Sequence, residues 1–283
     1  MYGADISATA LLWVAPLRMG SVTGGPGMRS VLISLEVQWG KPDENLLTAE
    51  KWIRASARLG ADIICLPEMA VVTDGPYPHG QFCHLSAPIP GRHSDRFSDW
   101  ARQYATHIAV GLLERTSDGF YSSAILINPE GKIVLKHRQV RNGSPYLAGD
   151  SFGAVDTDLG RVSIAICGDV WHEQFLRQTP ILAPDYIYVP MDWSAETHER
   201  GIVNNHRPPA FLREWKGVLA NASSLTGAVV MAVNCYSRDT DSDCGACGGA
   251  FVFKKGEEIR AKSACRGHWR QPTSEPLYVF DIV

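Results

Sequence analysis

Short apolar segments alternate with amphipathic ones along nearly the whole chain from Met28, and this alternation limits the fold more than any other feature of the sequence. The apolar segments have the length and composition of β-strands, whereas the amphipathic segments repeat their apolar residues at helical spacing. We expect strands at 31–38, 61–67, 108–114, 161–166, 186–190 and 228–234, hairpins at 122–140 and 249–261, and helices at 42–60, 95–107 and around 211–222.

Strands and helices that alternate in this way, with hairpins among them, are typical of a layered α/β domain with one or more mixed sheets. The 283 residues are 45% hydrophobic, which is enough to build a large core. No linker, composition break or repeat divides residues 28–283, so we expect a single domain there. Residues 1–27 end in Gly-Gly-Pro-Gly and are predicted to form a flexible N-terminal extension.

Charge and cysteine content argue against several classes of protein. The net charge is −3 with basic and acidic residues evenly mixed, so neither a nucleic-acid-binding surface nor a membrane surface is expected. Seven cysteines, an odd number with several in apolar strands, indicate a reducing compartment rather than a disulfide framework. Residues 1–27 lack the basic start and the uninterrupted apolar stretch of a secretory signal, and we expect a cytoplasmic protein.

Two reactive side chains follow predicted buried strands. Glu68 comes directly after the strand at 61–67, and Cys167 comes directly after the strand at 161–166. In open α/β folds, reactive groups gather at the carboxyl ends of strands. A carboxylate near a thiol can accept its proton and turn it into a nucleophile. Taken singly, such a cysteine is most often a small buried hydrophobe, and such a glutamate is most often a solvated loop residue.

The order of five motifs resembles that of the nitrilase, or carbon–nitrogen hydrolase, superfamily. Each motif is weakly specific alone, but five in the same order and spacing are strongly specific, and together they span nearly everything from Met28 to Val283. The motifs are GADIICLPEM (60–69), YSSAILINPEGKIVLKHRQV (121–140), LAGDSFGAVDTDLGRVSIAICGD (147–169), VVMAVN (229–234) and GGAFVFKKGEEI (248–259).

The resemblance implies a four-layer α-β-β-α sandwich that assembles through helices into a homodimer or a higher homo-oligomer. It also implies a small-molecule substrate: an amide, an N-carbamoyl compound or a nitrile. Cys167 would attack the carbonyl or nitrile carbon to form a thioester, Glu68 would transfer the protons, and the Gly168 N–H would stabilise the oxyanion. Asp192 and Trp193 fall where the family lines its substrate pocket, and Trp193 there either packs against the acyl group or has a plain packing role. The family uses no metal, and no cofactor is expected.

One position departs from the family pattern, because the place of its catalytic lysine is occupied by Gln139. A glutamine amide can donate to an oxyanion but brings no positive charge, and loss of one oxyanion donor typically costs about 10²–10³ in rate. Lys136 lies three residues away on an extended strand and is therefore expected on the opposite face. His137 and Arg141 lie two residues away, on the same face as Gln139.

Three interpretations of this departure are open. The chain is an active thiol amidase or acyltransferase with a modified oxyanion site, or a catalytically impaired homologue that binds a small molecule or a protein partner. Alternatively, it is a variant in which a lysine was replaced deliberately.

The remaining cysteines and histidines give weaker signals. A zinc site would need a second closely spaced pair beside Cys244 and Cys247, and none is present. His79, His84 and His172 are candidates to line a pocket, but ordinary surface or loop positions are favoured for all three.

Overall fold

The computed structural model describes most of the chain, including every motif that carries the resemblance. The described parts are residues 27–72, 79–140, 145–193, 210–236, 248–264 and 276–283. The predicted N-terminal extension, apart from its last residue, therefore lies outside the described residues.

Within these parts the strands form two mixed sheets. The first sheet has the order β12-β13-β1-β2-β3-β4-β5, and the second has the order β11-β10-β9-β8-β7-β6. The strands of the first sheet are β1 (Met28–Ile33), β2 (Ile63–Cys65), β3 (His107–Arg115), β4 (Phe120–Ile127), β5 (Ile133–Arg138), β12 (Ser263–Ala264) and β13 (Leu277–Ile282). Those of the second are β6 (Ala154–Thr157), β7 (Gly160–Ile164), β8 (Tyr186–Met191), β9 (Val229–Asn234), β10 (Ala250–Lys254) and β11 (Glu257–Ile259).

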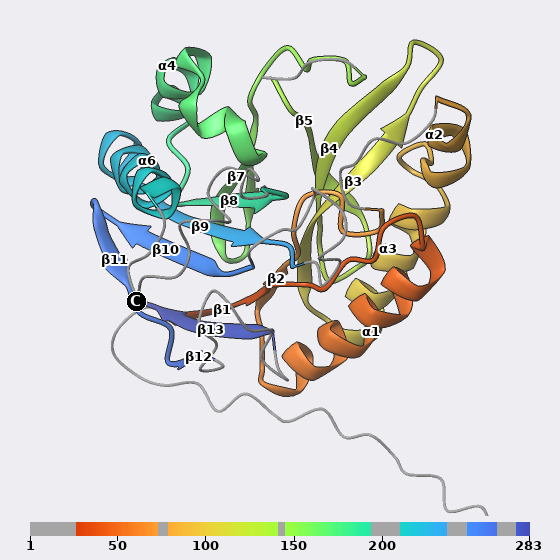
Figure 1. Ribbon diagram of the computed structural model, residues 1–283. Coiled ribbons are helices and arrows are strands. Elements are labelled where there is room, and N and C mark those ends of the chain that lie inside the picture. Colours follow the sequence, from red (N-terminus) through yellow and green to blue (C-terminus); the bar gives the residue numbers. More distant parts are fainter. Residues whose placement is uncertain (1–26, 73–78, 141–144, 194–209, 237–247, 265–275) are drawn as a thin grey trace, which may run out of the picture.

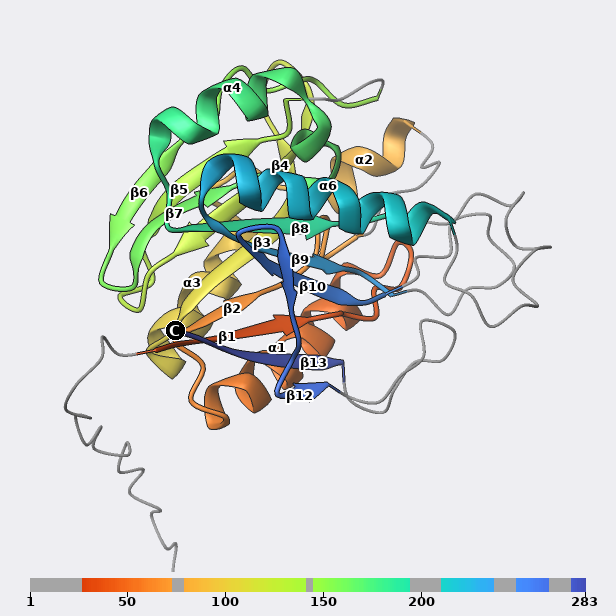
Figure 2. The ribbon, with the colours of Figure 1, turned by 90° about the vertical axis from the view of Figure 1, so that its left-hand side faces the viewer.

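Helices cover the outer face of each sheet, and the two inner faces pack together (Figures 1 and 2). Helices α1 (Pro42–Arg58) and α3 (Arg92–Tyr104) lie on the first sheet, while α4 (Glu173–Leu182) and α6 (Ala210–Thr226) lie on the second. A short helix, α2 (His79–Leu85), lies between β2 and α3 in the sequence. The predicted four-layer α-β-β-α fold is confirmed.

The period-two alternation of β1 explains how the layers are held together. Leu32 points into the core between the sheets, whereas Val31 and Ile33 point into the core beneath the helices. Ser30 also faces the second sheet, where its Oγ lies 3.2 Å from the hydroxyl of fully buried Tyr188. The inter-sheet core is therefore mainly apolar and contains at least one hydrogen bond that joins the two sheets.

The first predicted strand is displaced in the structure. It was expected at 31–38, but β1 begins at Met28 and ends at Ile33. Beyond that point the backbone leaves the sheet and bonds to the segment after β9, where the Val37 N–H donates to the Tyr236 carbonyl oxygen at 2.9 Å. Leu35 and Val37 are thus buried because they lie beside the segment after β9, and not because they continue β1.

The last strand crosses back to the first sheet. β13 follows the second sheet in the sequence, yet it pairs antiparallel with β1 along its whole length, from Met28 opposite Ile282 to Ile33 opposite Leu277. The first sheet is therefore completed by the C-terminal segment. None of the helices in the described parts is long and apolar enough to span a bilayer.

Candidate active site

A glycine on the neighbouring strand allows Glu68 to reach its position. The chain leaves β2 through Pro67, whose carbonyl oxygen accepts the N–H of Gly111 on β3 at 3.0 Å. A Cβ atom on Gly111 would lie 2.4 Å from the Glu68 Cα atom, so any larger residue would displace the glutamate. The next residue, Met69, has a φ of +46°, which turns the chain sharply after the carboxylate. Glu68 is held at the end of β2 and is 6% exposed.

Cys167 occupies a strained turn just beyond the end of β7. Ile166 is still extended, but Cys167 has a φ of +42° and begins a short 3-10 turn, Cys167–Trp171. A non-glycine residue in this left-handed conformation costs about 1–3 kcal/mol, and such outliers cluster at functional sites. The thiol is buried, and Gly168 follows it within the turn.

The Cys167 thiol lies beside the Glu68 carboxylate, whose charge acts on it. Ser122 Oγ on β4 donates to Glu68 Oε1 at 2.6 Å, and the Asp192 N–H after β8 donates to Glu68 Oε2 at 3.2 Å. Burial raises the pKa of Cys167 well above its ordinary value, and the negative charge of Glu68 raises it further, although the Asp192 backbone lowers it. The resting site therefore holds a protonated thiol beside a proton acceptor.

Asp192 connects this pair to a second thiol. Its Oδ1 atom accepts a hydrogen bond from the Cys235 Sγ atom at 2.7 Å. The two residues come together because β8 and β9 are parallel neighbours, with Met191 opposite Asn234. Burial raises the pKa of Cys235, and the charge of Asp192 raises it further.

Trp193, which follows β8, is held in place by Asn234 at the end of β9. Its backbone N–H donates to Asn234 Oδ1 at 2.8 Å, and Asn234 Nδ2 donates back to the Trp193 carbonyl oxygen at 2.9 Å. The indole ring is half-buried and packs edge-on against Trp215 of α6. Trp193 thus lies next in sequence to a residue that touches both Glu68 and Cys167.

Gln139 lies beside the cysteine turn. Its Nε2 atom donates to the Ile166 carbonyl oxygen at 3.1 Å, one residue before Cys167. The backbone of Gln139 is held on both sides, since its N–H donates to Ser122 and its carbonyl accepts from Gly149. The structure therefore brings Glu68, Gln139 and Cys167 together from three separate strand ends.

A buried carboxylate fastens β5 to the cysteine turn. Asp169 accepts the N–H groups of Ile166 and Val140, each at 2.8 Å, and pairs with His137 Nε2 at 2.7 Å. The His137 ring stacks on Phe152 with their centroids 4.9 Å apart. These contacts join the backbone before Cys167 to the segment that carries Gln139. The His137 side chain is therefore bound to Asp169.

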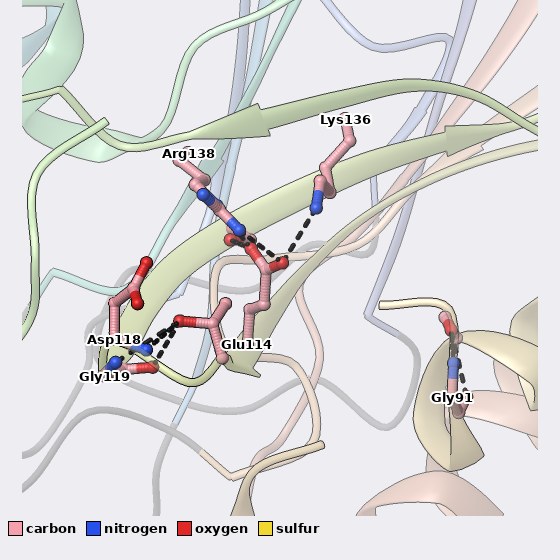
Figure 3. A network of polar contacts seen from close by, with 9 residues as sticks. Gly91, Glu114, Asp118, Gly119, Lys136 and Arg138 are labelled. Atoms are coloured by element: carbon pink, nitrogen blue, oxygen red, sulfur yellow. Dashed lines mark hydrogen bonds and ion pairs between the residues drawn. The ribbon is translucent and has the colours of Figure 1, made fainter. Parts of the chain in front are cut away.

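The opposite face of β5 carries a separate ion-pair network (Figure 3). Lys136 Nζ and Arg138 Nε each lie 2.8 Å from a carboxylate oxygen of Glu114, and Ser123 Oγ donates to the same group. Lys136 and Arg138 thus alternate with His137 and Gln139 along the strand, as a period of two requires. Lys136 therefore points away from the face that carries Gln139, and Arg141 lies outside the described residues.

The remaining predicted positions lie away from this cluster or outside the described residues. His172 accepts the N–H of Gln174 at the start of α4, and His84 is exposed on α2. The side chain of His79 and the residues Cys244 and Cys247 are not among those described. In the part of the chain that the structure describes, no cluster of histidine, cysteine or acidic side chains has the arrangement of a metal site.

Three contributors to the site were absent from the sequence-based set: Ser122, Asp169 and Cys235. Ser122 and Asp169 stand inside motifs that carry the resemblance, so their places in those motifs were the available signal. Cys235 gives no signal in the sequence. Its position depends on β9 lying next to β8, which the sequence pattern does not specify.

Comparisons with known proteins identify the family of this chain. The sequence model of the family described as carbon-nitrogen hydrolase matches residues 28–236. The omega-amidase of Xenopus tropicalis is 25% identical over 234 residues, which cover 78% of this chain and 79% of that protein. The bifunctional nitrilase/nitrile hydratase of Nicotiana tabacum is 22% identical over 253 residues, covering 80% of this chain and 66% of that protein.

Solved structures share the fold at lower identity. A carbon-nitrogen hydrolase from Helicobacter pylori superposes with a TM-score of 0.72 at 15% identity, covering 89% of this chain and 87% of the other. A CN-hydrolase superfamily protein from Xanthomonas campestris gives a TM-score of 0.71 at 17% identity, covering 91% of each chain. The family match includes the strands that carry Glu68, Gln139 and Cys167. The chain belongs to the carbon–nitrogen hydrolase family.

Proposed function

We propose that the protein is a cysteine-dependent amidase that hydrolyses a small amide through a thioester on Cys167. The observation that carries the proposal is the position of the buried Cys167 thiol, in its strained turn, beside the Glu68 carboxylate that Ser122 and the Asp192 backbone hold in place. It couples a nucleophile in a strained turn to a proton acceptor from the other sheet. Omega-amidases and nitrilases among the relatives support the same reaction class.

The reaction follows from the positions of the two groups. Glu68 takes the proton of Cys167 as the sulfur attacks the carbonyl carbon, and it returns that proton to the leaving amine. The carbonyl π bond opens to an oxyanion, which re-forms the carbonyl when the amine leaves and the thioester remains. A water molecule, deprotonated by Glu68, then attacks the thioester carbon. The C–S bond breaks, the sulfur takes the proton back from Glu68, and the acid is released with the thiol restored. An amine in place of water gives acyl transfer by the same steps.

Two neutral groups are proposed to stabilise the oxyanion. The backbone N–H of Gly168 follows the nucleophile directly, the usual place for one oxyanion donor. Gln139 Nε2 carries two hydrogens, of which one is donated to the Ile166 carbonyl oxygen. We propose that the second hydrogen is donated to the oxyanion. Neither donor brings the positive charge of the family lysine, so we expect slower acylation than that of a lysine-containing site.

The test is ammonia release from a panel of small primary amides, with two cysteine variants compared. Cys167→Ala should lower kcat/KM by at least about 10³-fold, because the nucleophile is lost. Cys83→Ala is the matched control, since that thiol is free and exposed on α2, and it should leave the rate unchanged. Intact mass spectrometry of the wild type, quenched in acid during turnover, should show one acyl group, which Cys167→Ala should lack. Undiminished turnover in Cys167→Ala would overturn the proposal.

A binding role is the second candidate, and the neutral Gln139 is the observation that favours it. The raised pKa of Cys167, caused by burial and then by Glu68, also leaves little thiolate in the resting site. A binding protein would turn over no amide and would accumulate no acyl group even from an activated ester such as p-nitrophenyl acetate. It would still bind a small acid or amide, which isothermal titration calorimetry detects.

We also propose a homodimer or higher homo-oligomer in a reducing, cytoplasmic setting. The four cysteines in the described parts of the chain, Cys65, Cys83, Cys167 and Cys235, are all free. Light scattering after gel filtration measures the assembly. Thiol titration of the denatured protein checks the redox state, with seven reactive thiols expected from the sequence.

A further inference from the structure

Two adjacent serines on β4 each donate a hydrogen bond to a buried glutamate. Ser122 Oγ lies 2.6 Å from Glu68 Oε1. Ser123 Oγ lies 2.6 Å from Glu114 Oε2. Neighbouring side chains of a strand point to opposite faces, so the two serines contact different glutamates. Both serines are buried, and the two hydrogen bonds therefore differ mainly in which glutamate they hold.

The hydroxyl of Ser122 binds one of the two Glu68 oxygens. It donates to Oε1, while the Asp192 N–H donates to Oε2 at 3.2 Å. The Asp192 backbone also acts on the Cys167 thiol. Oε2 therefore lies on the side of the thiol, and Oε1 lies on the side of β4. One oxygen is held by the first sheet, and the other is placed to exchange a proton with Cys167.

The backbone of Ser122 holds a second part of the site. Its carbonyl oxygen accepts the Gln139 N–H at 2.9 Å. The residue thus contacts Glu68 through its side chain and Gln139 through its main chain. A substitution that removes only the hydroxyl breaks the first contact and keeps the donor and acceptor of the second. The contribution of the hydroxyl can therefore be measured by itself.

Burial works against the charge that Glu68 needs as a proton acceptor. The residue is 6% exposed, and a buried carboxylate is harder to ionise than a solvated one. The titratable groups that the structure places near it include Cys167, Asp192 and Cys235, at the ends of β7, β8 and β9. All three are acids, so none of them supplies a positive charge. A hydroxyl donor binds a carboxylate more strongly than a neutral carboxyl group, so Ser122 favours the ionised form.

We propose that Ser122 is a positioning residue for the reaction and that it acts through Glu68. Its hydroxyl fixes Oε1, leaves Oε2 to take the proton of Cys167, and keeps the carboxylate ionised between turnovers. When Oε2 is protonated, Oε1 is still an acceptor, so the hydrogen bond holds the side chain through the whole cycle. The inference rests on the proposed amidase function and names a residue on which its proton transfer depends.

The first test is the pH dependence of kcat/KM for a small primary amide in the wild type and in Ser122→Ala. The acidic limb of this profile reports the ionisation of the base in the free enzyme. Loss of the donor makes ionisation harder, so the limb should move to higher pH by about one unit, as expected for a hydrogen bond to a charged group. On the plateau above the limb, kcat/KM should fall by about tenfold, because Oε1 is no longer fixed.

Ser123→Ala is the matched control. It removes the same hydroxyl, with the same hydrogen-bond length, from the neighbouring residue, and it affects Glu114 instead of Glu68. A merely structural effect of deleting a buried hydroxyl would appear in both variants as a lower melting temperature. Only Ser122→Ala should move the acidic limb. A limb that moves equally in both variants, or in neither, overturns the inference.

A second pair of variants guards against poor folding of Ser122→Ala. Ser122→Thr and Ser122→Val have nearly the same shape, but only threonine keeps a hydroxyl. Any effect of the added methyl group on packing is therefore common to both. Threonine should retain the acidic limb of the wild type, and valine should move it to higher pH. Equal limbs in these two variants would mean that the hydroxyl is not responsible.

The second test does not depend on amide hydrolysis. Iodoacetamide alkylates Cys167, and peptide mass spectrometry measures the rate at each pH. The wild-type rate should show an acidic limb where Glu68 becomes able to accept the thiol proton, and Ser122→Ala should move that limb to higher pH. A shift in alkylation without amide hydrolysis by the wild type would support the role of Ser122 and overturn the amidase function. Amide hydrolysis with no shift in either assay, or alkylation without an acidic limb, would overturn the inference alone.

Discussion

At the scale of single residues, the proposed reaction depends most on Gln139. Its amide nitrogen lies 3.1 Å from the carbonyl oxygen that precedes the nucleophile. Gln139→Lys would place an ammonium beside Cys167, where it favours both the thiolate and the oxyanion. We expect kcat/KM for neutral amides to rise by at least about tenfold, given what one oxyanion donor contributes.

Lys136→Gln is the matched control for that change, because it removes a lysine from the opposite face of the same strand. It should leave amide hydrolysis unaltered. Thermal melting is measured alongside, since a lysine buried without a partner lowers stability. A Gln139→Lys protein that melts normally, gains no activity and accumulates no acyl group would argue for the binding role.

At the scale of elements, the placement of Glu68 depends on β3 having no side chain at Gly111. Gly111→Ala would put a Cβ atom 2.4 Å from the Glu68 Cα atom, so one backbone must move. We expect kcat/KM to fall by tenfold or more, and stability to fall by about 1–3 kcal/mol as in other overpacked sites. Enzyme assays and urea denaturation measure the two effects.

Gly217→Ala provides the contrast. Gly217 is exposed in the middle of α6, and a Cβ atom there would meet nothing within 4 Å. Alanine should stabilise the helix by about 0.5–1 kcal/mol without affecting activity. A Gly111→Ala protein with full activity would show that Glu68 tolerates displacement and that its position is less critical than proposed.

The elements also show what the sequence could and could not predict. The alternation of residues 136–139 was sufficient to separate Lys136 from Gln139, because a strand has only two faces. By contrast, α4 was missed, and it contains a proline, Pro180, which is unfavourable inside a helix. The contact between Asp192 and Cys235 was beyond prediction, since it arises from the order of strands in a sheet and not from any local pattern.

At the scale of the whole molecule, the Glu114 network links stability to pH. Burial would raise the pKa of Glu114, but hydrogen bonds from Arg138, Lys136 and Ser123 outweigh it and hold the pKa at about 2, below its ordinary 4.5. A lowered pKa stabilises the fold above pH 4.5, and this contribution is lost as the pH falls towards 2.

Glu114→Gln should therefore lower the free energy of unfolding at neutral pH by about 1–2 kcal/mol, less than the full pKa shift implies because Lys136 and Arg138 are about one-third exposed. The difference from the wild type should shrink when urea denaturation is repeated near about pH 3. A difference that does not depend on pH would mean that packing, and not charge, makes Glu114 stabilising.

The boundary of the domain gives a further prediction for the whole molecule. Met28 is the first residue of β1 and pairs with Ile282, and the family match also begins at residue 28. A chain that starts at Met28 should have the same melting temperature and amidase activity as the full chain, as calorimetry and the amide assay would show. A melting temperature that is many degrees lower in the shortened chain would mean that residues 1–27 contribute to the fold.

The return of β13 to the first sheet has a consequence for how activity arises during synthesis. Glu68 belongs to the first sheet and Cys167 to the second, and β1 finds its antiparallel partner only in β13. A nascent chain that lacks β13 leaves the backbone of β1 unsatisfied along one edge. We therefore expect the first sheet, which carries Glu68, to reach its final form only after β13 has left the ribosome. The amidase activity proposed above would then appear only once synthesis is complete.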